Sequence, residues 1–244
     1  MPGVPAAPGK RTALEDGLII RFIGEKEDLN GSFPRLATWG EERLAGNVAY
    51  CPEGGFFVNL AGDYNYIEAA YYVSQDIEAE GRPVHPTCQE MLDAYVPPLF
   101  LEKARLAGLP VPNYYVTNDF FEPPVIVDTI NPFMYRQMVV LKEGMQRRVA
   151  KSLTRNFTYA ICCQELPERA KVAYFRCVMG ECGAGRFREA ARRFWEAFRL
   201  PLAEVRVILA PGGEILLSGV DPLPWKKLTP RERARLNRRV QWPG

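Results

Sequence analysis

The sequence predicts an α+β fold: a mixed sheet with packed helices that ends in a helix–β-hairpin–helix unit. Strand-like apolar runs and helical segments follow one another in mixed order, which is typical of this class. Segment 185–200 places Phe187, Phe194 and Phe198 on one helical face, opposite arginines. Two apolar runs then flank a Pro-Gly-Gly turn at 211–213, which predicts a hairpin. An α/β fold with a Rossmann-like front half is the alternative.

The chain has 244 residues, of which 47% are hydrophobic and 25% are charged, an ordinary composition for a soluble globular protein. Residues 1–16 are rich in Pro, Gly and Ala and predict a flexible leader, whereas residues 17–244 predict a single domain. The leader lacks the apolar core of a signal peptide, and no apolar run approaches the roughly 20 residues that cross a bilayer. We therefore expect a cytoplasmic protein.

The first half of the chain is expected to begin with two strands and a helix. Strand-like runs occupy 17–24 and 53–62, and glycines bound the second of them. The helix that follows has an apolar face with steps of four, three and four residues. That face consists of Tyr66, Ala70, Val73 and Ile77. Asp63 or Asn65 is expected to cap the start of this helix, and Gly81 to end it.

The remaining elements are predicted from the same kinds of signal. A short strand at 82–87 precedes a helix at 88–95, which resumes at 99–108 beyond two prolines. The middle and later elements are extended segments at 109–117 and 123–130, a helix at 134–153, strands at 157–166 and 171–180, and a hairpin over 203–221. The final helix, 229–240, has Thr229 as its N-cap and Glu232 completing a capping box.

Two blocks of the sequence carry a family signature, one at about 55–95 and one at about 172–235. The matching residues are Asn59, Tyr64, Tyr66, Tyr71 to Ser74, Glu78 to Gly81, Pro86, Thr87, Pro201, Leu202, Val205, Pro222, Leu223 and Leu228. Together the blocks resemble the RimK-like ATP-grasp N-terminal (RLAN) domain family. The segment at about 96–170 diverges from that family, and the ATP-grasp ligase domain that usually follows is not expected in this chain.

The resemblance implies a non-catalytic accessory or recognition protein of a peptide-modifying ATP-grasp amidoligase system. It implies a separately encoded ligase or other peptide-modifying enzyme as partner, and no cofactor for this chain. The residues agree, because the sequence has no G-x-x-x-x-G-K-[ST] loop and no complete hydrolase constellation. Two alternatives stay open: a divergent enzyme with a Cys/His site, and binding of RNA or an acidic partner through the basic C-terminal half.

A Cys/His site would depend on few residues. His85 is the sole histidine, and the candidate nucleophiles are Cys88, Cys162 and Cys163. A cysteine nucleophile needs a base that generates its thiolate. Cys162 and Cys163 are neighbours in an apolar strand, so they point to opposite faces and at most one can meet the histidine. Buried structural thiols are the favoured interpretation, and the irregular cysteine spacing predicts no metal site.

The tyrosine-rich segment supplies the candidate binding residues. Helical periodicity places Tyr66 in the core and leaves Tyr64 and Tyr72 for a polar-tipped surface. Asn59 and Asp63 can join Tyr64 around a ligand, because binding groups gather on loops that rigid elements hold in place. The complete set of binding candidates is Asn59, Asp63, Tyr64, Tyr72 and His85.

Charge is distributed unevenly along the chain. Residues 1–140 carry 10 Lys and Arg against 19 Asp and Glu, and residues 141–244 carry 21 against 10, although the whole chain has a net charge of +2. A basic half is compatible with a face for phosphate, nucleic acid or an acidic protein. The basic surface candidates are Arg235, Arg238 and Arg239. A solvated helix face is the simpler interpretation of the same residues.

Overall fold

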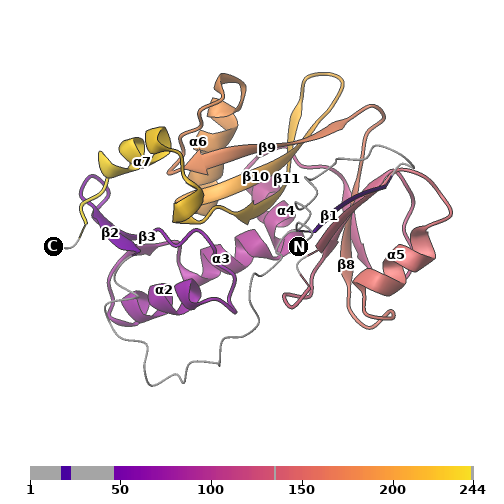
Figure 1. Cartoon of the computed structure of the whole chain (residues 1–244), viewed down its shortest axis with the longest axis horizontal. Helices are drawn as coiled ribbons and strands as arrows, with labels where there is room; N and C mark the ends of the chain where they lie inside the picture. The colour runs from indigo at the N-terminus through magenta and orange to yellow at the C-terminus, as the bar shows by residue number, and fades with distance from the viewer. Residues whose placement is uncertain (1–17, 23–46, 135, 243–244) are drawn as a thin grey trace, which may run out of the picture.

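The computed structural model describes residues 18–22, 47–134 and 136–242, which form three sheets with helices packed on and between them (Figure 1). The small sheet lies with α2 and α3 at one end of the molecule, the three-stranded sheet in the middle and the five-stranded sheet at the other end. Within the described residues, no helix is both long enough and apolar enough to cross a membrane. The cytoplasmic location stays a prediction.

The five-stranded sheet is antiparallel throughout. Its strands, in spatial order, are β1 (Leu18–Phe22), β7 (Arg136–Val140), β6 (Val125–Thr129), β8 (Ile161–Glu165) and β5 (Tyr114–Thr117). Helix α5 (Gln146–Leu153) packs on one face of this sheet, where Val149 and Leu153 join Val127 and Val140 in one buried cluster. The other face of the sheet is turned toward the three-stranded sheet.

The three-stranded sheet is also antiparallel and contains β9 (Lys171–Val178), β10 (Leu202–Leu209) and β11 (Ile215–Pro222). Helices α6 (Arg188–Phe198) and α4 (Pro97–Leu106) cover it. The Phe198 ring stacks on Phe100 and on Phe194, at centroid distances of 4.7 and 5.0 Å. These fully buried rings belong to the largest core cluster of the described residues.

The small sheet contains β2 (Val48–Cys51), β3 (Phe56–Asn59) and β4 (Val84–His85). Strands β3 and β4 are parallel, and α2 (Ala69–Ala79) lies between them in sequence. Helix α3 (Cys88–Tyr95) follows β4, and a Thr87–Glu90 capping box begins it. The Rossmann-like character suggested for the front half is therefore limited to this one parallel pair among the described strands.

The backbone of Gly62 joins the small sheet to the end of β11. The carbonyl oxygen of Gly62 accepts a 2.8 Å hydrogen bond from the backbone N–H of Leu223. Gly62 has a φ of +79°, and a Cβ atom at this position would lie 2.0 Å from the Leu223 carbonyl oxygen. Only glycine combines that backbone conformation with so close an approach.

The predicted α+β class and the C-terminal helix–hairpin–helix are confirmed. Helix α6 precedes the β10–β11 hairpin, and helix α7 (Pro230–Asn237) ends the unit with the expected capping box between Thr229 and Glu232. The helix predicted at 134–153 is wrong in its first part, because residues 136–140 form β7. The strands predicted at 157–166 and 171–180 exist as β8 and β9, but they belong to different sheets. The leader at 1–16 lies outside the described residues.

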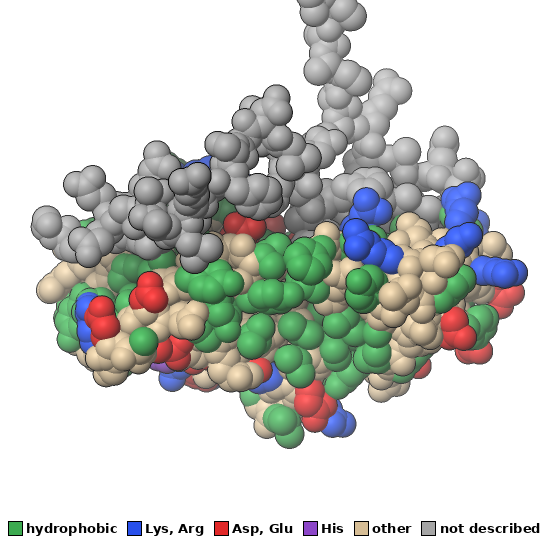
Figure 2. All heavy atoms as spheres, turned by 90° about the horizontal axis from the view of Figure 1, so that it is seen from below, with side chains coloured by type: hydrophobic (Ala, Val, Ile, Leu, Met, Phe, Trp, Pro, Cys, Tyr) green, Lys and Arg blue, Asp and Glu red, His purple; other side chains and the backbone are tan. Residues whose placement is uncertain are grey.

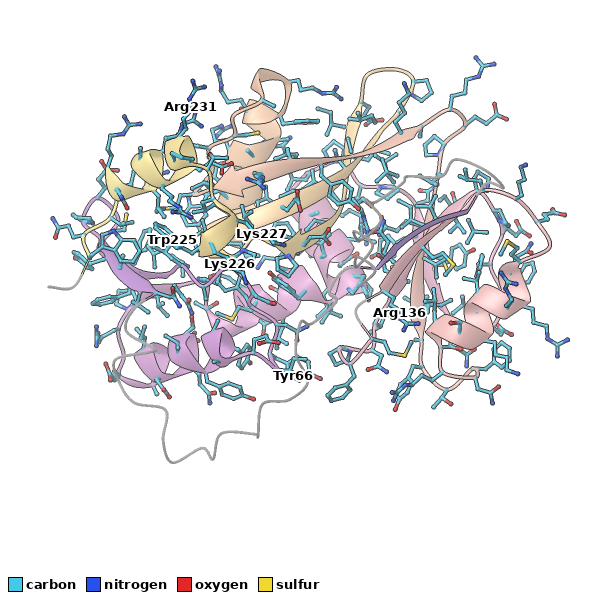
Figure 3. The ribbon with its side chains drawn as sticks, viewed as in Figure 1. Tyr66, Arg136, Trp225, Lys226, Lys227 and Arg231 are labelled. Atoms are coloured by element: carbon cyan, nitrogen blue, oxygen red, sulfur yellow. The ribbon has the colours of Figure 1, made fainter. Side chains whose placement is uncertain are left out.

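The start of α2 also differs from the prediction. Asp63 and Asn65 do not cap the helix, because each accepts a 3.4 Å bond from a backbone amide two residues later in the loop. The helix begins at Ala69, with Glu68 as the N-cap. Tyr66 therefore precedes the helix and is 37% exposed instead of buried. Tyr66 lies on the lower side of the molecule in Figure 3. Figure 2, which views the molecule from below, shows that hydrophobic side chains gather on that face.

Candidate functional site

A small cavity lies where the five-stranded sheet meets the three-stranded sheet and the helices of the first half. We call it the inter-sheet site. Its lining residues are Ala94, Tyr95, Pro97, Phe100, Asp128, Thr129, Arg136, Gln137, Arg206, Ser218, Gly219, Val220 and Asp221. The cavity volume is about 30 Å³, which is enough for water but far below the 300 Å³ or more that is usual for a small-molecule pocket.

A buried ion pair between Asp128 on β6 and Arg206 on β10 connects the two sheets. The Nη1 of Arg206 donates to Oδ1 of Asp128 at 2.8 Å, and its Nη2 donates to Oδ2 at 2.7 Å. The side chains are only 9% and 5% exposed, respectively. Burial alone would lower the pKa of the Arg206 guanidinium, but the charge and hydrogen bonds of Asp128 outweigh that effect and raise it. The Arg206 guanidinium group is therefore held in its charged form.

Two further side chains complete the hydrogen bonds of this pair. Gln164 on β8 donates to Oδ2 of Asp128 at 2.7 Å and to the backbone oxygen of Ser218 at 2.8 Å. The Ser218 hydroxyl donates to Gln164 at 2.8 Å and accepts a 2.9 Å bond from Nε of Arg206. A second bond from Nη2 of Arg206 reaches the Ser218 backbone oxygen at 2.8 Å. These four residues form the inter-sheet network, in which each buried charge is compensated.

A β-bulge explains how Ser218 reaches the network. Arg206 pairs with Gly219 across the β10–β11 ladder, whereas Val207 already pairs with Leu217, so Ser218 is the extra residue. Bulges of this kind re-aim side chains beside functional sites. Here the bulge turns both the hydroxyl and the carbonyl of Ser218 toward the guanidinium group of Arg206.

Other polar groups surround the network within the cavity. Arg136 is the lining arginine with an exposed side chain, so it marks the side that solvent reaches, between the five-stranded sheet and α3 (Figure 3). Tyr95 also lines the cavity, and burial raises the pKa of its hydroxyl well above the ordinary value. The negative charges of Asp63 and Asp221 add to that rise. Of these two carboxylates, Asp221 also lines the cavity.

The structure distributes the five binding candidates over separate places. Asn59 and Tyr64 have structural positions, since the amide of Asn59 donates to the Ala70 carbonyl at 2.8 Å and the hydroxyl of Tyr64 donates to the Asn59 carbonyl at 2.9 Å. Tyr64 is fully buried, contrary to the surface position predicted for it. Tyr72 is 52% exposed, as predicted for its position on the helix. None of the five candidates is among the residues that line the inter-sheet site.

His85 lies in the small sheet and away from the cavity lining. Its Nδ1 is 2.9 Å from a carboxylate oxygen of Glu90, and its ring packs edge-on against Phe56 at a centroid distance of 4.8 Å. The same Glu90 oxygen also accepts the backbone N–H of Thr87 in the α3 capping box. These contacts give His85 a role in holding the start of α3 against β3.

The candidate cysteine nucleophiles are in environments that disfavour the thiolate. Cys162 and Cys163 are buried and belong to core clusters on opposite faces of the five-stranded sheet, as predicted for neighbours in a strand. Burial, followed by the charge of Asp128, raises the pKa of both thiols, that of Cys163 to about 12. Burial and then Glu78 raise the pKa of the Cys88 thiol to about 11. The geometry therefore gives no support to a Cys/His site.

We predict slow alkylation of Cys88 by iodoacetamide in the folded protein. With a pKa of about 11, it holds far less thiolate at pH 8 than an ordinary thiol, so its reaction should be about a hundredfold slower. Because the thiolate fraction rises with pH below the pKa, the rate should increase by about tenfold per pH unit up to that value. Mass spectrometry of the peptide measures the rate, Cys88→Ser provides the background, and fast labelling at pH 8 would contradict the prediction.

The basic surface candidates also do not converge on one site. Arg235 lies 3.8 Å from a carboxylate oxygen of Glu181, and Arg239 donates to the Met179 carbonyl oxygen at 2.6 Å. Arg238 is exposed. Figure 3 shows Lys226 and Lys227 beside Trp225, whereas Arg231 in α7 lies apart from them. The arrangement is that of a solvated surface with local pairs, and RNA binding stays an untested prediction.

Sequence reasoning missed the residues of the inter-sheet network. Asp128 stands in the apolar run 125–129, and Arg206 stands in the apolar run 202–209. A charge inside an apolar strand must find a compensating partner, and this was the available signal. Neither apolar run alone, however, indicates which strand will pack against it.

No protein-family model matches the sequence, and no curated protein matches it in sequence. Solved structures match it in fold. A D-Alanine-D-Alanine Ligase from Helicobacter pylori has a TM-score of 0.54 at 13% identity, over 74% of this chain and 70% of the ligase. A RimK domain protein ATP-grasp from Sphaerobacter thermophilus has a TM-score of 0.51 at 14% identity, over 68% of this chain and 71% of that protein. The chain has an ATP-grasp-like fold.

A third match shows how much of a longer protein the chain spans. It covers 53% of the length of an N5-carboxyaminoimidazole ribonucleotide synthetase, with a TM-score of 0.49 and 14% identity. A likeness in fold does not transfer the activities of these longer proteins to this chain.

These matches overturn two expectations. The assignment as a stand-alone RLAN domain without an ATP-grasp part is wrong, because the matches to ATP-grasp proteins extend over 68% and 74% of this chain. The interpretation as a non-catalytic accessory protein rested on that assignment and is wrong for the same reason. The difference lies in the segment 96–170, which the sequence predicts as a divergent part of an RLAN domain. That segment contains β5 to β8 and so provides most of the five-stranded sheet.

Proposed function

We propose that this chain is an enzyme built on the ATP-grasp-like fold, with the inter-sheet site as its active site and a carboxylate- or phosphate-bearing substrate. The observation that carries the proposal is a buried charged network at the junction of two antiparallel sheets, in a fold shared with a D-Alanine-D-Alanine Ligase. Cavities with a few convergent polar groups are the usual place for a site. Arg136 supports the anionic character of the substrate, because it is the exposed cation of the lining.

The ATP-grasp-like fold implies a magnesium-bound nucleotide, so its fit to this site can be tested. The cavity volume of about 30 Å³ is too small for a nucleotide in the conformation described. Both carboxylate oxygens of Asp128 are occupied by Arg206. Within the described residues, no group of three or more His, Cys, Asp or Glu side chains could hold a metal ion. A magnesium nucleotide does not fit these residues, and we derive no reaction step through it.

The remaining groups suggest what the site does with a substrate. Arg136 would attract and orient the anionic group from the exposed side by charge-assisted hydrogen bonds. Tyr95 would donate a hydrogen bond and keep its proton, because burial raises its pKa. The fixed inter-sheet network would provide a rigid polar wall, as preorganised dipoles do in active sites.

The proposal is tested by measuring ligand binding and turnover with a defined panel: ATP and ADP with and without Mg²⁺, inorganic phosphate, amino acids and dipeptides. We expect at least one anionic compound to raise the melting temperature by about 2 to 4 °C, because a ligand stabilises the folded state that binds it. Mass spectrometry of the mixtures tests for conversion of that compound. Arg136→Gln should abolish the shift, whereas Arg188→Gln, an exposed arginine outside the cavity lining, should retain it.

Two results would overturn the proposal. One is the absence of any shift and any conversion over the whole panel. The other is a shift of equal size in the wild type and in Arg136→Gln, because the ligand would then bind somewhere other than the inter-sheet site.

A further inference from the structure

We propose that Arg206 is a built-in cation of the inter-sheet site, which takes the place of a divalent metal ion and makes the site metal-independent. The inference goes beyond the proposed function, because it concerns ion binding and would hold even if the site had no catalytic role. It rests on three features: the contacts of the Asp128 carboxylate, the space opposite Arg206 and the charge balance of the cavity.

The contacts of Asp128 leave its carboxylate committed to protein donors. Each oxygen accepts one guanidinium N–H of Arg206, at 2.8 and 2.7 Å, and Oδ2 also accepts the amide of Gln164 at 2.7 Å. Such a fork-on-fork arrangement satisfies the carboxylate in the way that a bound cation would. A hard divalent cation would need the same oxygen atoms as ligands. It could bind only after displacing Arg206 from a buried position.

The residue opposite Arg206 shows that the sequence makes room for the guanidinium group. Gly219 is its cross-strand neighbour, and a Cβ atom on Gly219 would lie 2.9 Å from Nη2 and 3.2 Å from Cζ of Arg206. The guanidinium group therefore fills the space that a side chain at 219 would occupy. A side chain at 219, an acidic one included, would displace the Arg206 guanidinium group from its present position.

The charge balance of the cavity favours the same conclusion. Arg206 faces Asp128 directly, and Asp221 lies near enough for its charge to help raise the pKa of the guanidinium group. Asp221 is 5% exposed and lines the same cavity. The positive charge of Arg206 therefore faces the two carboxylates of Asp128 and Asp221. Arg136, which is exposed, adds a second positive charge to the lining. The local excess of negative charge that attracts a divalent ion is thus removed.

The test compares divalent-ion binding in the wild type and in Arg206→Met, by calorimetric titration with Mn²⁺ and by melting temperature in MgCl₂ against KCl of equal ionic strength. The wild type should show no binding that depends on Asp128 and no melting shift specific to MgCl₂. Arg206→Met leaves the Asp128 carboxylate without its cation, so its affinity for Mn²⁺ should exceed that of the wild type by about tenfold or more. Adding Asp128→Asn to that variant should remove the gain.

Two more variants test whether the positive charge of residue 206 or the bidentate geometry of its guanidinium group excludes the metal ion. They also provide a result if Arg206→Met does not fold. Arg206→Lys keeps a positive charge without the fork, so it should remain insensitive to Mn²⁺. Asp128→Asn leaves Arg206 buried with a neutral partner, so phosphate should raise its melting temperature while MgCl₂ should not. Mn²⁺ binding by the wild type that Asp128→Asn abolishes would overturn the proposal, as would an Arg206→Met protein that folds and gains no affinity. If neither single variant folds, the wild-type titration alone decides.

Discussion

Arg206→Met should lower the free energy of unfolding by about 3–5 kcal/mol, because it leaves the buried carboxylate of Asp128 without its partner. Asp128→Asn should cost a similar amount for the reciprocal reason, since the guanidinium group has only 5% of its surface exposed. The double variant should be less destabilised than the sum of the two, because neither charge is then left uncompensated.

Urea denaturation of the four proteins measures the coupling between the two residues. The exposed pair Arg192–Glu189, with side chains 55% and 68% exposed, provides a control within the same chain. Its coupling energy should stay below about 1 kcal/mol, as is usual for surface pairs. Equal coupling energies for the buried and the exposed pair would show that the inter-sheet network contributes nothing beyond an ordinary surface contact.

Gly62→Ala should lower the free energy of unfolding by more than about 2 kcal/mol. The added Cβ atom would have to share space with the Leu223 carbonyl group, 2.0 Å away, and the φ of +79° is unfavourable for alanine. The chain must move apart at this junction, so the hydrogen bond from Leu223 to Gly62 should also weaken.

Gly55→Ala is the matched control for that substitution. Gly55 has a similar φ of +69°, but a Cβ atom there would meet nothing within 4 Å. Its cost should therefore be limited to the left-handed backbone, about 1 kcal/mol. Thermal unfolding of both variants measures the difference. A loss as large for Gly55→Ala as for Gly62→Ala would mean that close packing on β11 is not what makes Gly62 necessary.

The elements that sequence reasoning predicted well are those whose signals are local. The capping box at Thr229 and Glu232 and the turn at 211–213 each depend on residues only a few positions apart. Strand β7 was missed because its sequence, Arg136–Val140, continues into a segment with helical spacing. Its strand conformation is determined by pairing with β1 and β6, which is not visible in the segment itself.

The candidate site was largely beyond prediction for a related reason. Asp128 and Arg206 are separated by most of the middle of the chain and meet only because two sheets pack against each other. The sequence predicts a binding site in the tyrosine-rich segment instead, because aromatic residues at a strand end are a common sign of a binding surface. In the structure, Tyr64 is a core residue that braces the loop after β3, and neither Tyr64 nor Asp63 lines the cavity.

The pairing of Arg206 with Gly219 has a consequence for how this protein can evolve. A descendant that replaced Arg206 alone would inherit an uncompensated carboxylate at 128, and one that enlarged Gly219 alone would collide with the guanidinium group. Neither single step is neutral, so the three positions can change only in combination. We therefore expect Asp128, Arg206 and Gly219 to coevolve, and neutral substitutions to accumulate at other positions.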